Sequence, residues 1–122
     1  MKRSALVDCY QYMVNSGGID TLESYPYDQK PPLCRFKPEN IGASIQGYGT
    51  VTEGDEEELK AVVGTLGPVS VIVTADLIFI LYRKGIYFND NWLNASEPYN
   101  HALTVIGYGS ENGQDYWIVR NE

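Results

Sequence analysis

The chain has 122 residues, of which 43% are hydrophobic and 20% are charged. It contains 12 glycine residues. This composition is typical of a globular chain with a modest core and argues against disorder. Sixteen acidic residues against nine basic ones give a net charge of -7, which argues against a nucleic-acid backbone or an anionic membrane as a partner. No apolar run approaches the roughly 20 residues that span a bilayer. The length predicts a single domain, or part of one, over residues 1–122.

The first half of the chain is rich in turn residues. A short apolar stretch, residues 10–14, predicts one or two helical turns that end at Asn15-Ser16-Gly17-Gly18. Residues 28–32 predict a loop. Alternation and β-branched residues over residues 41–52 predict a strand. We therefore expect mostly loops in this half, with one short helix and one strand.

The strongest helix signal follows this strand. Thr52 or Asp55 can cap the helix, and three glutamates at residues 56–58 suit the positive end of its dipole. Apolar residues then recur at helical spacing until the Gly-Pro pair at residues 67–68 stops the helix; they are Leu59, Val62, Val63 and Leu66. The acidic run at residues 53–58 lacks the spacing of metal ligands, so it predicts a solvated helix start and no metal site.

The next part of the chain predicts strands around one short helix. Residues 69–73 are typical of a buried strand. The dense apolar run of residues 75–82 has no clear period, and its length favours a short helix. Residues 85–88 predict another short strand, and residues 89–99 predict a polar loop.

The end of the chain predicts a β-hairpin. Strands are expected at residues 101–109 and 115–120, joined through residues 110–113 with Asn112-Gly113 at the apex. Together the elements predict an antiparallel β layer with one or two helices packed on it, which is an α+β arrangement.

Two features favour an oxidising compartment. Cys9 and Cys34 are the only cysteines, and they permit one disulfide, which a cytosolic protein seldom keeps. The triplet Asn94-Ala95-Ser96 fits a glycosylation acceptor, although the same triplet often arises by chance.

The single histidine, His101, opens the first strand of the predicted hairpin. A lone histidine is more often structural than catalytic, but its surroundings favour catalysis. Residues 100–109 and 111–121 closely resemble the histidine and asparagine segments of papain-like cysteine peptidases, above all the cathepsin L-type branch. Further landmarks resemble the same family in the same order, at residues 17–21, 23–27, 34–36 and 67–71. The resemblance therefore covers nearly all of the chain.

The resemblance implies a fold and a reaction. The fold is α+β and papain-like, mainly the antiparallel β-rich lobe with a short remnant of the helical lobe. In this family a cysteine thiolate attacks the peptide carbonyl and a histidine imidazolium protonates the leaving amine, with no cofactor. On this match His101 is the general acid and base, and Asn121 orients its ring. The match also implies a structural disulfide between Cys9 and Cys34.

The nucleophile segment of the family has no counterpart in this chain. The family pattern Gln…Cys-Gly-Ser-Cys-Trp is absent, and Cys9 lies in the Val-Asp-Cys-Tyr context of the disulfide cysteine. A family loop, Gly-Cys-x-Gly-Gly, is missing after Cys9. The third family disulfide lacks its first cysteine near Trp92, and the family's Ser-Trp-Gly does not follow Asn121. We therefore expect an excised C-terminal part of a peptidase, inactive alone.

The same match predicts part of a substrate pocket. Ile72, Tyr99 and Ala102 fall at positions that line the family's main specificity pocket, and Asn100 offers backbone groups to the substrate. The bulk of Ile72 and Tyr99 favours an apolar substrate side chain in a fairly shallow pocket. Ile72 is equally well explained as a core residue of its strand.

The resemblance also implies partners and a location. The partners are a peptide or protein substrate, together with a chain that carries the nucleophile lobe, a second copy of this chain or a cystatin-like inhibitor. The location is lysosomal or extracellular. A different hypothesis is a truncated, non-catalytic homologue that binds a peptidase, an inhibitor or an extended peptide. An incomplete gene product is a third hypothesis, and the sequence leaves all three open.

Overall fold

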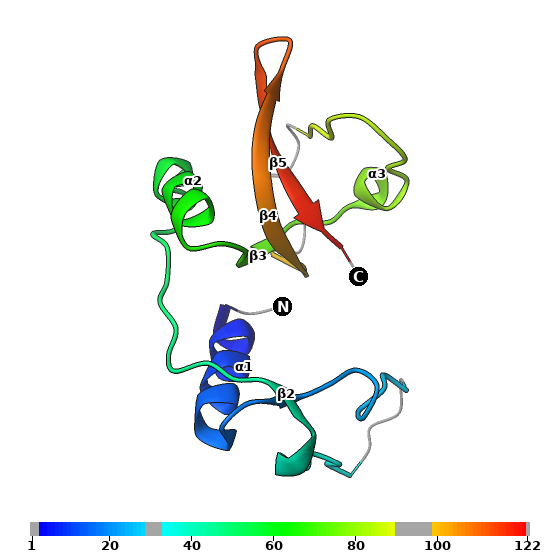
Figure 1. Cartoon of the computed structure of the whole chain (residues 1–122). Helices are drawn as coiled ribbons and strands as arrows, with labels where there is room; N and C mark the ends of the chain where they lie inside the picture. Colours follow the sequence, from blue (N-terminus) through cyan, green and yellow to red (C-terminus); the bar gives the residue numbers. More distant parts are fainter. Residues whose placement is uncertain (1–2, 29–32, 90–98, 122) are drawn as a thin grey trace. The chain divides into compact units, whose positions relative to one another are not determined.

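Figure 1 shows the computed structural model of the chain, which describes residues 3–28, 33–89 and 99–121. The chain forms two compact units: one spans Ser4–Thr50, and the other spans Val51–Glu122 together with residues 1–3. The elements, in chain order, are α1 (Arg3–Ser16), β1 (Ile19–Asp20), η1 (Pro38–Asn40), β2 (Ile41–Ala43), α2 (Glu56–Thr65), β3 (Val69–Val73), α3 (Leu77–Ile80), β4 (His101–Glu111) and β5 (Gln114–Arg120). No helix in the described ranges is long and apolar enough to cross a bilayer. The expectation of a single, partial domain over residues 1–122 stays a prediction.

Helix α1 is longer than the sequence predicts. It has 14 residues, whereas the turn signals and apolar residues predict only residues 10–14. The earlier turns escape prediction because Ala5-Leu6-Val7 is a continuous apolar run rather than a stripe at helical spacing. The helix ends where Gly17 and Gly18 take φ angles of +81° and +151°, which suit glycine far better than a residue with a Cβ.

A two-stranded antiparallel sheet, β1 with β2, follows α1, with Ile19 opposite Ala43. The predicted strand over residues 41–52 is wrong beyond Ala43, because β1 is only two residues long and offers no longer partner among the described residues. Gly18 is needed beside this pair, since a Cβ there would lie 2.5 Å from the carbonyl oxygen of Ala43.

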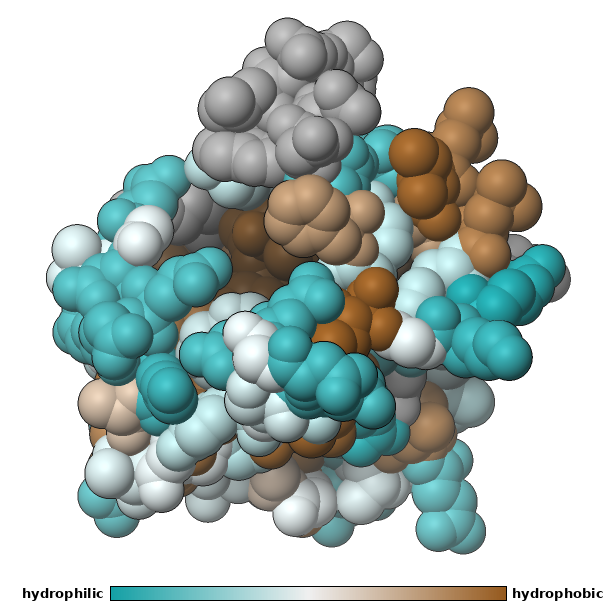
Figure 2. Space-filling view, turned by 90° about the horizontal axis from the view of Figure 1, so that it is seen from above, coloured by the Kyte–Doolittle hydropathy of each residue, from teal (hydrophilic) through white to brown (hydrophobic). Residues whose placement is uncertain are grey.

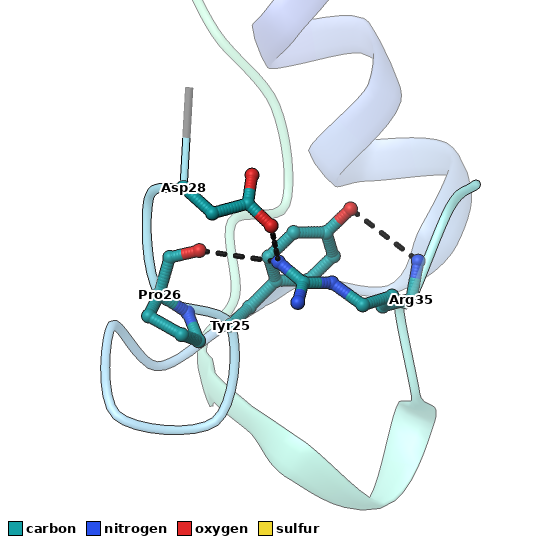
Figure 3. Close-up of polar contacts among 4 residues, drawn as sticks. All are labelled: Tyr25, Pro26, Asp28 and Arg35. Atoms are coloured by element: carbon teal, nitrogen blue, oxygen red, sulfur yellow. Dashed lines mark hydrogen bonds and ion pairs between the residues drawn. The ribbon is translucent and has the colours of Figure 1, made fainter. Parts of the chain in front are cut away.

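Arg35 holds together the segment between β1 and η1 (Figure 3). Its Nη2 donates to the carbonyl oxygen of Pro26 at 3.2 Å and lies 3.1 Å from Oδ2 of Asp28. The guanidinium carbon lies 4.8 Å from the centre of the Tyr25 ring, and the backbone amide of Arg35 donates to Oη of Tyr25 at 3.3 Å. One side chain therefore joins the two ends of the segment that runs from residue 25 to residue 35.

The structure does not contain the disulfide that the resemblance implies. Cys9 and Cys34 are both free cysteines, and both are exposed. A disulfide requires facing Cβ atoms and a short Cα separation. Cys9 lies within helix α1 and Cys34 in the non-helical segment before η1, and their sulfurs are not bonded to each other.

Helix α2 is the element that local sequence signals describe best. The carboxylate of Asp55 caps it by accepting from the backbone amide of Glu58 at 2.8 Å. The carboxylate of Glu58 in turn accepts from the backbone amide of Thr52 at 2.8 Å, which satisfies a second amide before the first turn. Gly67 follows the helix with a φ of +114°. The predicted helix is therefore confirmed, with Asp55 as its cap.

The second unit is built on a three-stranded antiparallel sheet in the order β3-β4-β5, visible in Figure 1. β3 has its predicted range, and the predicted hairpin is confirmed with slightly longer strands. Asn112 and Gly113 form its turn with φ angles of 52° and 80°, as a type I′ turn requires. α2 packs on β3 and β4, and the buried hydrophobic residues among those described are Val63, Leu103 and Val105. The predicted α+β class is confirmed.

The segment after β3 departs from the prediction. The expected helix over residues 75–82 is reduced to the four residues of α3, and the expected strand over residues 85–88 does not form within this described stretch. Instead, the hydroxyl of Tyr82 donates to the carbonyl oxygen of Gly85 at 2.5 Å. A hydrogen bond from a side chain therefore holds this segment close to α3. A strand would instead need hydrogen bonds to the backbone of a neighbouring strand. Most of the predicted loop, residues 90–98, lies outside the described residues.

Candidate active site

His101 and Asn121 lie together at one end of the three-stranded sheet. His101 is the first residue of β4, and Asn121 directly follows β5. The hairpin register, which pairs Thr104 with Arg120, returns the chain to the start of β4. Nε2 of His101 lies 2.8 Å from Oδ1 of Asn121. Because Oδ1 of an amide only accepts, Nε2–H is the donor, and this bond selects that tautomer of the ring.

A second side chain, Phe79 of α3, contacts the imidazole of His101. The two ring centres are 5.9 Å apart, with an angle of 64° between the ring planes. Phe79 also meets Tyr87 edge to face, at 5.3 Å and 87°. Sequence reasoning missed Phe79, because no period in the apolar run of residues 75–82 separates it from its neighbours.

Asp76 connects these aromatic residues to α3. Its Oδ1 accepts from the backbone amide of Phe79 at 2.8 Å and from the hydroxyl of Tyr87 at 3.1 Å. Its Oδ2 accepts from Nδ2 of Asn89 at 2.6 Å. The Phe79 amide, above the other donors, lowers the pKa of Asp76 although partial burial opposes it. Burial raises the pKa of Tyr87, so a neutral phenol faces a charged carboxylate.

Asn100 precedes His101 and bonds the backbone of Ala75 through its side chain. Oδ1 of Asn100 accepts from the amide of Ala75 at 2.8 Å, and Nδ2 donates to the carbonyl oxygen of Ala75 at 2.9 Å. The backbone amide of the preceding Tyr99 donates to Oγ1 of Thr74 at 3.2 Å. Tyr99 has a φ of 59°, which is uncommon for a bulky residue.

The predicted substrate-binding residues lie at the same end of the sheet. Ile72 is opposite Ala102 in the β3–β4 register, one pair away from Val73 and His101. Ile72 and Ala102 are half-buried, whereas Tyr99 is 45% exposed. The structure therefore brings Ile72, Ala102 and the Tyr99–Asn100 pair close to His101 in the fold, and their contact with a substrate stays a prediction.

The structure does not place the other predicted site residues relative to His101. Asn94, the expected glycosylation acceptor, lies outside the described residues. Cys9 and Cys34 belong to the Ser4–Thr50 unit, and His101 belongs to the other unit. Among the described residues, no group of three or more His, Cys, Asp and Glu side chains could hold a metal ion.

Comparison with known proteins gives a consistent family. Residues 3–122 match the family described as papain family cysteine protease. A cathepsin L-like peptidase of Aedes aegypti is 42% identical over 114 residues, which cover 92% of this chain and 33% of the relative. The oryzain gamma chain of Oryza sativa subsp. japonica is 39% identical over 112 residues, covering 92% of this chain and 31% of the relative. The chain therefore spans about a third of the length of these curated relatives.

Solved structures agree with the sequence comparison. The digestive procathepsin L2 proteinase of the Tenebrio molitor larval midgut has a TM-score of 0.84 and 38% identity, over 93% of this chain and 36% of that one. Digestive procathepsin L 3 of the same tissue has a TM-score of 0.83 and 37% identity, over 92% of this chain and 36% of that one. The papain-like fold, with mainly the β-rich lobe, is confirmed.

Proposed function

Because the chain belongs to the papain family of cysteine proteases, we propose that it is the histidine- and asparagine-bearing part of a cathepsin L-like cysteine endopeptidase. In this proposal the whole enzyme hydrolyses peptide bonds, and the attacking thiolate comes from a segment other than those of Cys9 and Cys34. The chain alone is then inactive, because it offers His101 no nucleophile.

The hydrogen bond between His101 and Asn121 is the observation that carries this proposal. With Nε2–H donated to Asn121, Nδ1 is the imidazole atom that can exchange a proton with a thiol. In the proposed reaction Nδ1 takes the thiol proton, and the thiolate sulfur bonds to the peptide carbonyl carbon. The C–N bond then breaks as Nδ1–H gives its proton to the leaving amine. Water hydrolyses the resulting thioester with Nδ1 as base, which releases the acid and restores the thiol.

The substrate pocket in this proposal is lined by Ile72, Tyr99 and Ala102. Their placement beside His101 supports this role, and their side chains favour an apolar residue in the peptide. Asn100 contacts the peptide through its backbone in this proposal, because its side-chain amide is bonded to Ala75.

We place the whole enzyme in an acidic compartment, either a lysosome or an extracellular digestive lumen. Support comes from the two structural relatives, which are named as digestive procathepsins of a larval midgut, and from the acidic balance of the chain. Its proposed partners are a peptide or protein substrate, the lobe that carries the nucleophile and a cystatin-like inhibitor.

The proposal is tested by reconstitution. The chain is mixed with a separately produced nucleophile lobe of a cathepsin L-like enzyme, and hydrolysis of a fluorogenic peptide with an apolar side chain is followed. Association of the two parts is measured in the same samples by analytical ultracentrifugation. We expect turnover from the complex and none from the complex made with His101→Ala. A stable complex without turnover would contradict the proposal.

One observation favours a second candidate function, a non-catalytic binding module. Helix α3 and the residue after it expose Leu77, Ile80 and Leu81 by 77%, 66% and 67%. Figure 2 shows apolar side chains at the surface on the face that it displays. Exposed apolar residues grouped in this way are typical of protein-binding surfaces. In the reconstitution experiment, association without hydrolysis supports this function instead.

A further inference from the structure

Helix α3 is too short to be stable by itself. It has four residues, and an isolated helix needs about 12 to 15 residues to be even marginally stable in water. Burial contributes little to it, because Leu77, Ile78 and Ile80 are exposed by 77%, 58% and 66%. Only Phe79 is partly buried within the helix. The position of Phe79 therefore depends on polar contacts at the start of the helix.

Those contacts converge on the carboxylate of Asp76. One oxygen, Oδ1, binds both the Phe79 amide and the Tyr87 hydroxyl, and the other oxygen binds the side chain of Asn89. The Asn89 amide also donates to the Tyr87 hydroxyl at 3.2 Å. Phe79 and Tyr87 contact each other edge to face, so Asp76 is bonded to both members of this ring pair. Removing the carboxylate removes one hydrogen bond from the backbone amide of Phe79 and one from the hydroxyl of Tyr87 at once.

Phe79 also contacts the imidazole ring of His101. Asn121 fixes only one atom of this imidazole, Nε2, through a hydrogen bond between exposed groups. Such a bond contributes little to holding the ring, because water competes for the same atoms. A packed ring adds a second restraint, since it limits rotation of the imidazole about its bond to Cβ.

We propose that Asp76 is a positioning residue of this active site, which fixes α3 so that Phe79 packs against His101 and keeps its imidazole directed at Asn121. The inference rests on the proposed function and adds a residue to it. Asp76 acts through Phe79, without contact with the substrate.

The chain offers a matched control for this proposal in Asp55. Both aspartates cap a helix, and each accepts from a backbone amide three residues later at 2.8 Å. Figure 1 shows their helices, α2 and α3, on opposite sides of the sheet. Asp55→Ala therefore removes the same kind of cap without altering Phe79 or Tyr87.

Nuclear magnetic resonance signals of His101 test the positioning role of Asp76. If Asp76 contributed only to the stability of the fold, its substitution would not shift these signals in the folded chain. His101 is the only histidine, so its two carbon-bound ring protons give an unambiguous pair of signals. Phe79→Leu removes the aromatic ring current and defines the size and sign of its effect on these signals. We expect Asp76→Ala to shift them in the same direction by most of that amount, and Asp55→Ala to leave them unchanged.

Tyr87→Phe keeps the ring and the helix cap but removes the hydroxyl that bonds Asp76 and Asn89, so it remains informative if Asp76→Ala does not fold. We expect a smaller shift of the same sign. His101 signals that stay at their wild-type positions in a folded Asp76→Ala chain, or in Tyr87→Phe, would overturn the proposal. So would signals that do not respond to Phe79→Leu.

Reconstitution with the nucleophile lobe separates this inference from the proposed function. We expect Asp76→Ala to lower kcat with KM nearly unchanged, and Asp55→Ala to retain both values. If the wild-type complex shows no turnover, the proposed function fails while the His101 signals still decide the role of Asp76. If turnover occurs and kcat is the same in Asp76→Ala as in wild type, the positioning role fails alone.

Discussion

The side chain of Asn100 continues the pairing of β3 with β4 beyond the last backbone pair, Val73 with His101, by bonding both the amide and the carbonyl of Ala75. A primary amide has one acceptor and one donor in the arrangement of a peptide group, so it can take the place of a backbone partner. The start of β4, where His101 lies, is therefore held on the β3 side as well as by the hairpin.

We expect Asn100→Ala to lower the free energy of unfolding by about 1 kcal/mol, because two exposed hydrogen bonds are lost. Asn100→Asp is the sharper variant. At neutral pH its carboxylate still accepts from the Ala75 amide, but its second oxygen faces the Ala75 carbonyl. Below about pH 4 the protonated acid can donate to that carbonyl. The difference in the free energy of unfolding between Asn100→Asp and wild type should therefore become smaller. Urea denaturation at pH 7 and at pH 3.5 measures this, and equal stability of all three chains at pH 7 would contradict it.

We expect Asn121→Ala to change the tautomer of His101. In the wild-type chain the bond to Oδ1 of Asn121 selects, of the two neutral tautomers, the one with the proton on Nε2. Without that acceptor both tautomers should be populated, which the two ring nitrogen shifts of a nitrogen-15-labelled chain report. Gln114→Ala, at the opposite end of β5, is the control and should keep the wild-type shifts. Unchanged nitrogen shifts in Asn121→Ala would show that this bond does not select the tautomer.

The stability of the chain should depend on the ionisation of Asp76. The Phe79 amide first, and then the Tyr87 and Asn89 side chains, lower the pKa of Asp76 below its ordinary value of 3.8. A carboxyl group with a lowered pKa stabilises the fold above its ordinary pKa, and this contribution is lost as the pH falls through the folded-state pKa. Asp76→Asn should therefore be less stable than wild type at pH 7, and the gap should close as the pH falls below 3.8.

Urea denaturation of both chains between pH 7 and pH 2.5 measures that gap. Glu111→Gln is the control, because it removes a negative charge at the hairpin end of β4. A gap between wild type and Asp76→Asn that is constant over the whole range would show that the carboxylate charge of Asp76 does not contribute to stability.

Local signals account for the elements that the sequence predicted well. Helix α2 has its cap, its acidic first turn and its apolar spacing within a dozen residues, and the hairpin has Asn112-Gly113 at its turn. The position of the helix and of the hairpin turn could therefore be predicted from the sequence, whereas the register shift between Val105 and Gly107 could not. The pairing of His101 with Asn121 follows from that hairpin, because two paired strands bring their outer ends together.

The features that the sequence did not predict depend on contacts between side chains that are separated along the chain and follow no sequence pattern. Tyr87 lies in a stretch with strand-like composition, yet its hydroxyl is bonded to Asp76 and its ring to Phe79, so the stretch is held by side chains. Phe79 has the same apolar character as its exposed neighbours, and only the position of His101 in the fold distinguishes it.

The free cysteines predict a thiol count. Because Cys9 and Cys34 are free and exposed, we expect two thiols per native chain to react with an aromatic disulfide reagent, and one in Cys9→Ser. The count is made before and after treatment with a reductant. No thiol before reduction and two after it would show that the disulfide implied by the family resemblance forms in solution.

Arg35 should stabilise its segment through geometry more than through charge. Its ion pair with Asp28 joins side chains that are 44% and 38% exposed, and such pairs contribute little. The bond to the Pro26 carbonyl and the stacking on Tyr25 need the planar guanidinium. We therefore expect Arg35→Ala to lower the free energy of unfolding by about 1 kcal/mol, and Arg35→Lys to lose most of the same amount although it keeps the charge.

Lys37→Ala is the control for the Arg35 variants, because it also removes a positive charge from this part of the chain. The backbone amide of Lys37 donates to the carboxylate of Asp20, and the substitution keeps that amide. Limited proteolysis adds a local measurement, because loosening the segment between residues 25 and 35 should speed cleavage there in both Arg35 variants and leave it unchanged in Lys37→Ala. Wild-type stability and cleavage in Arg35→Lys would mean that charge alone holds this segment. In that case the stacking on Tyr25 and the bond to Pro26 would have no measurable share in its stability.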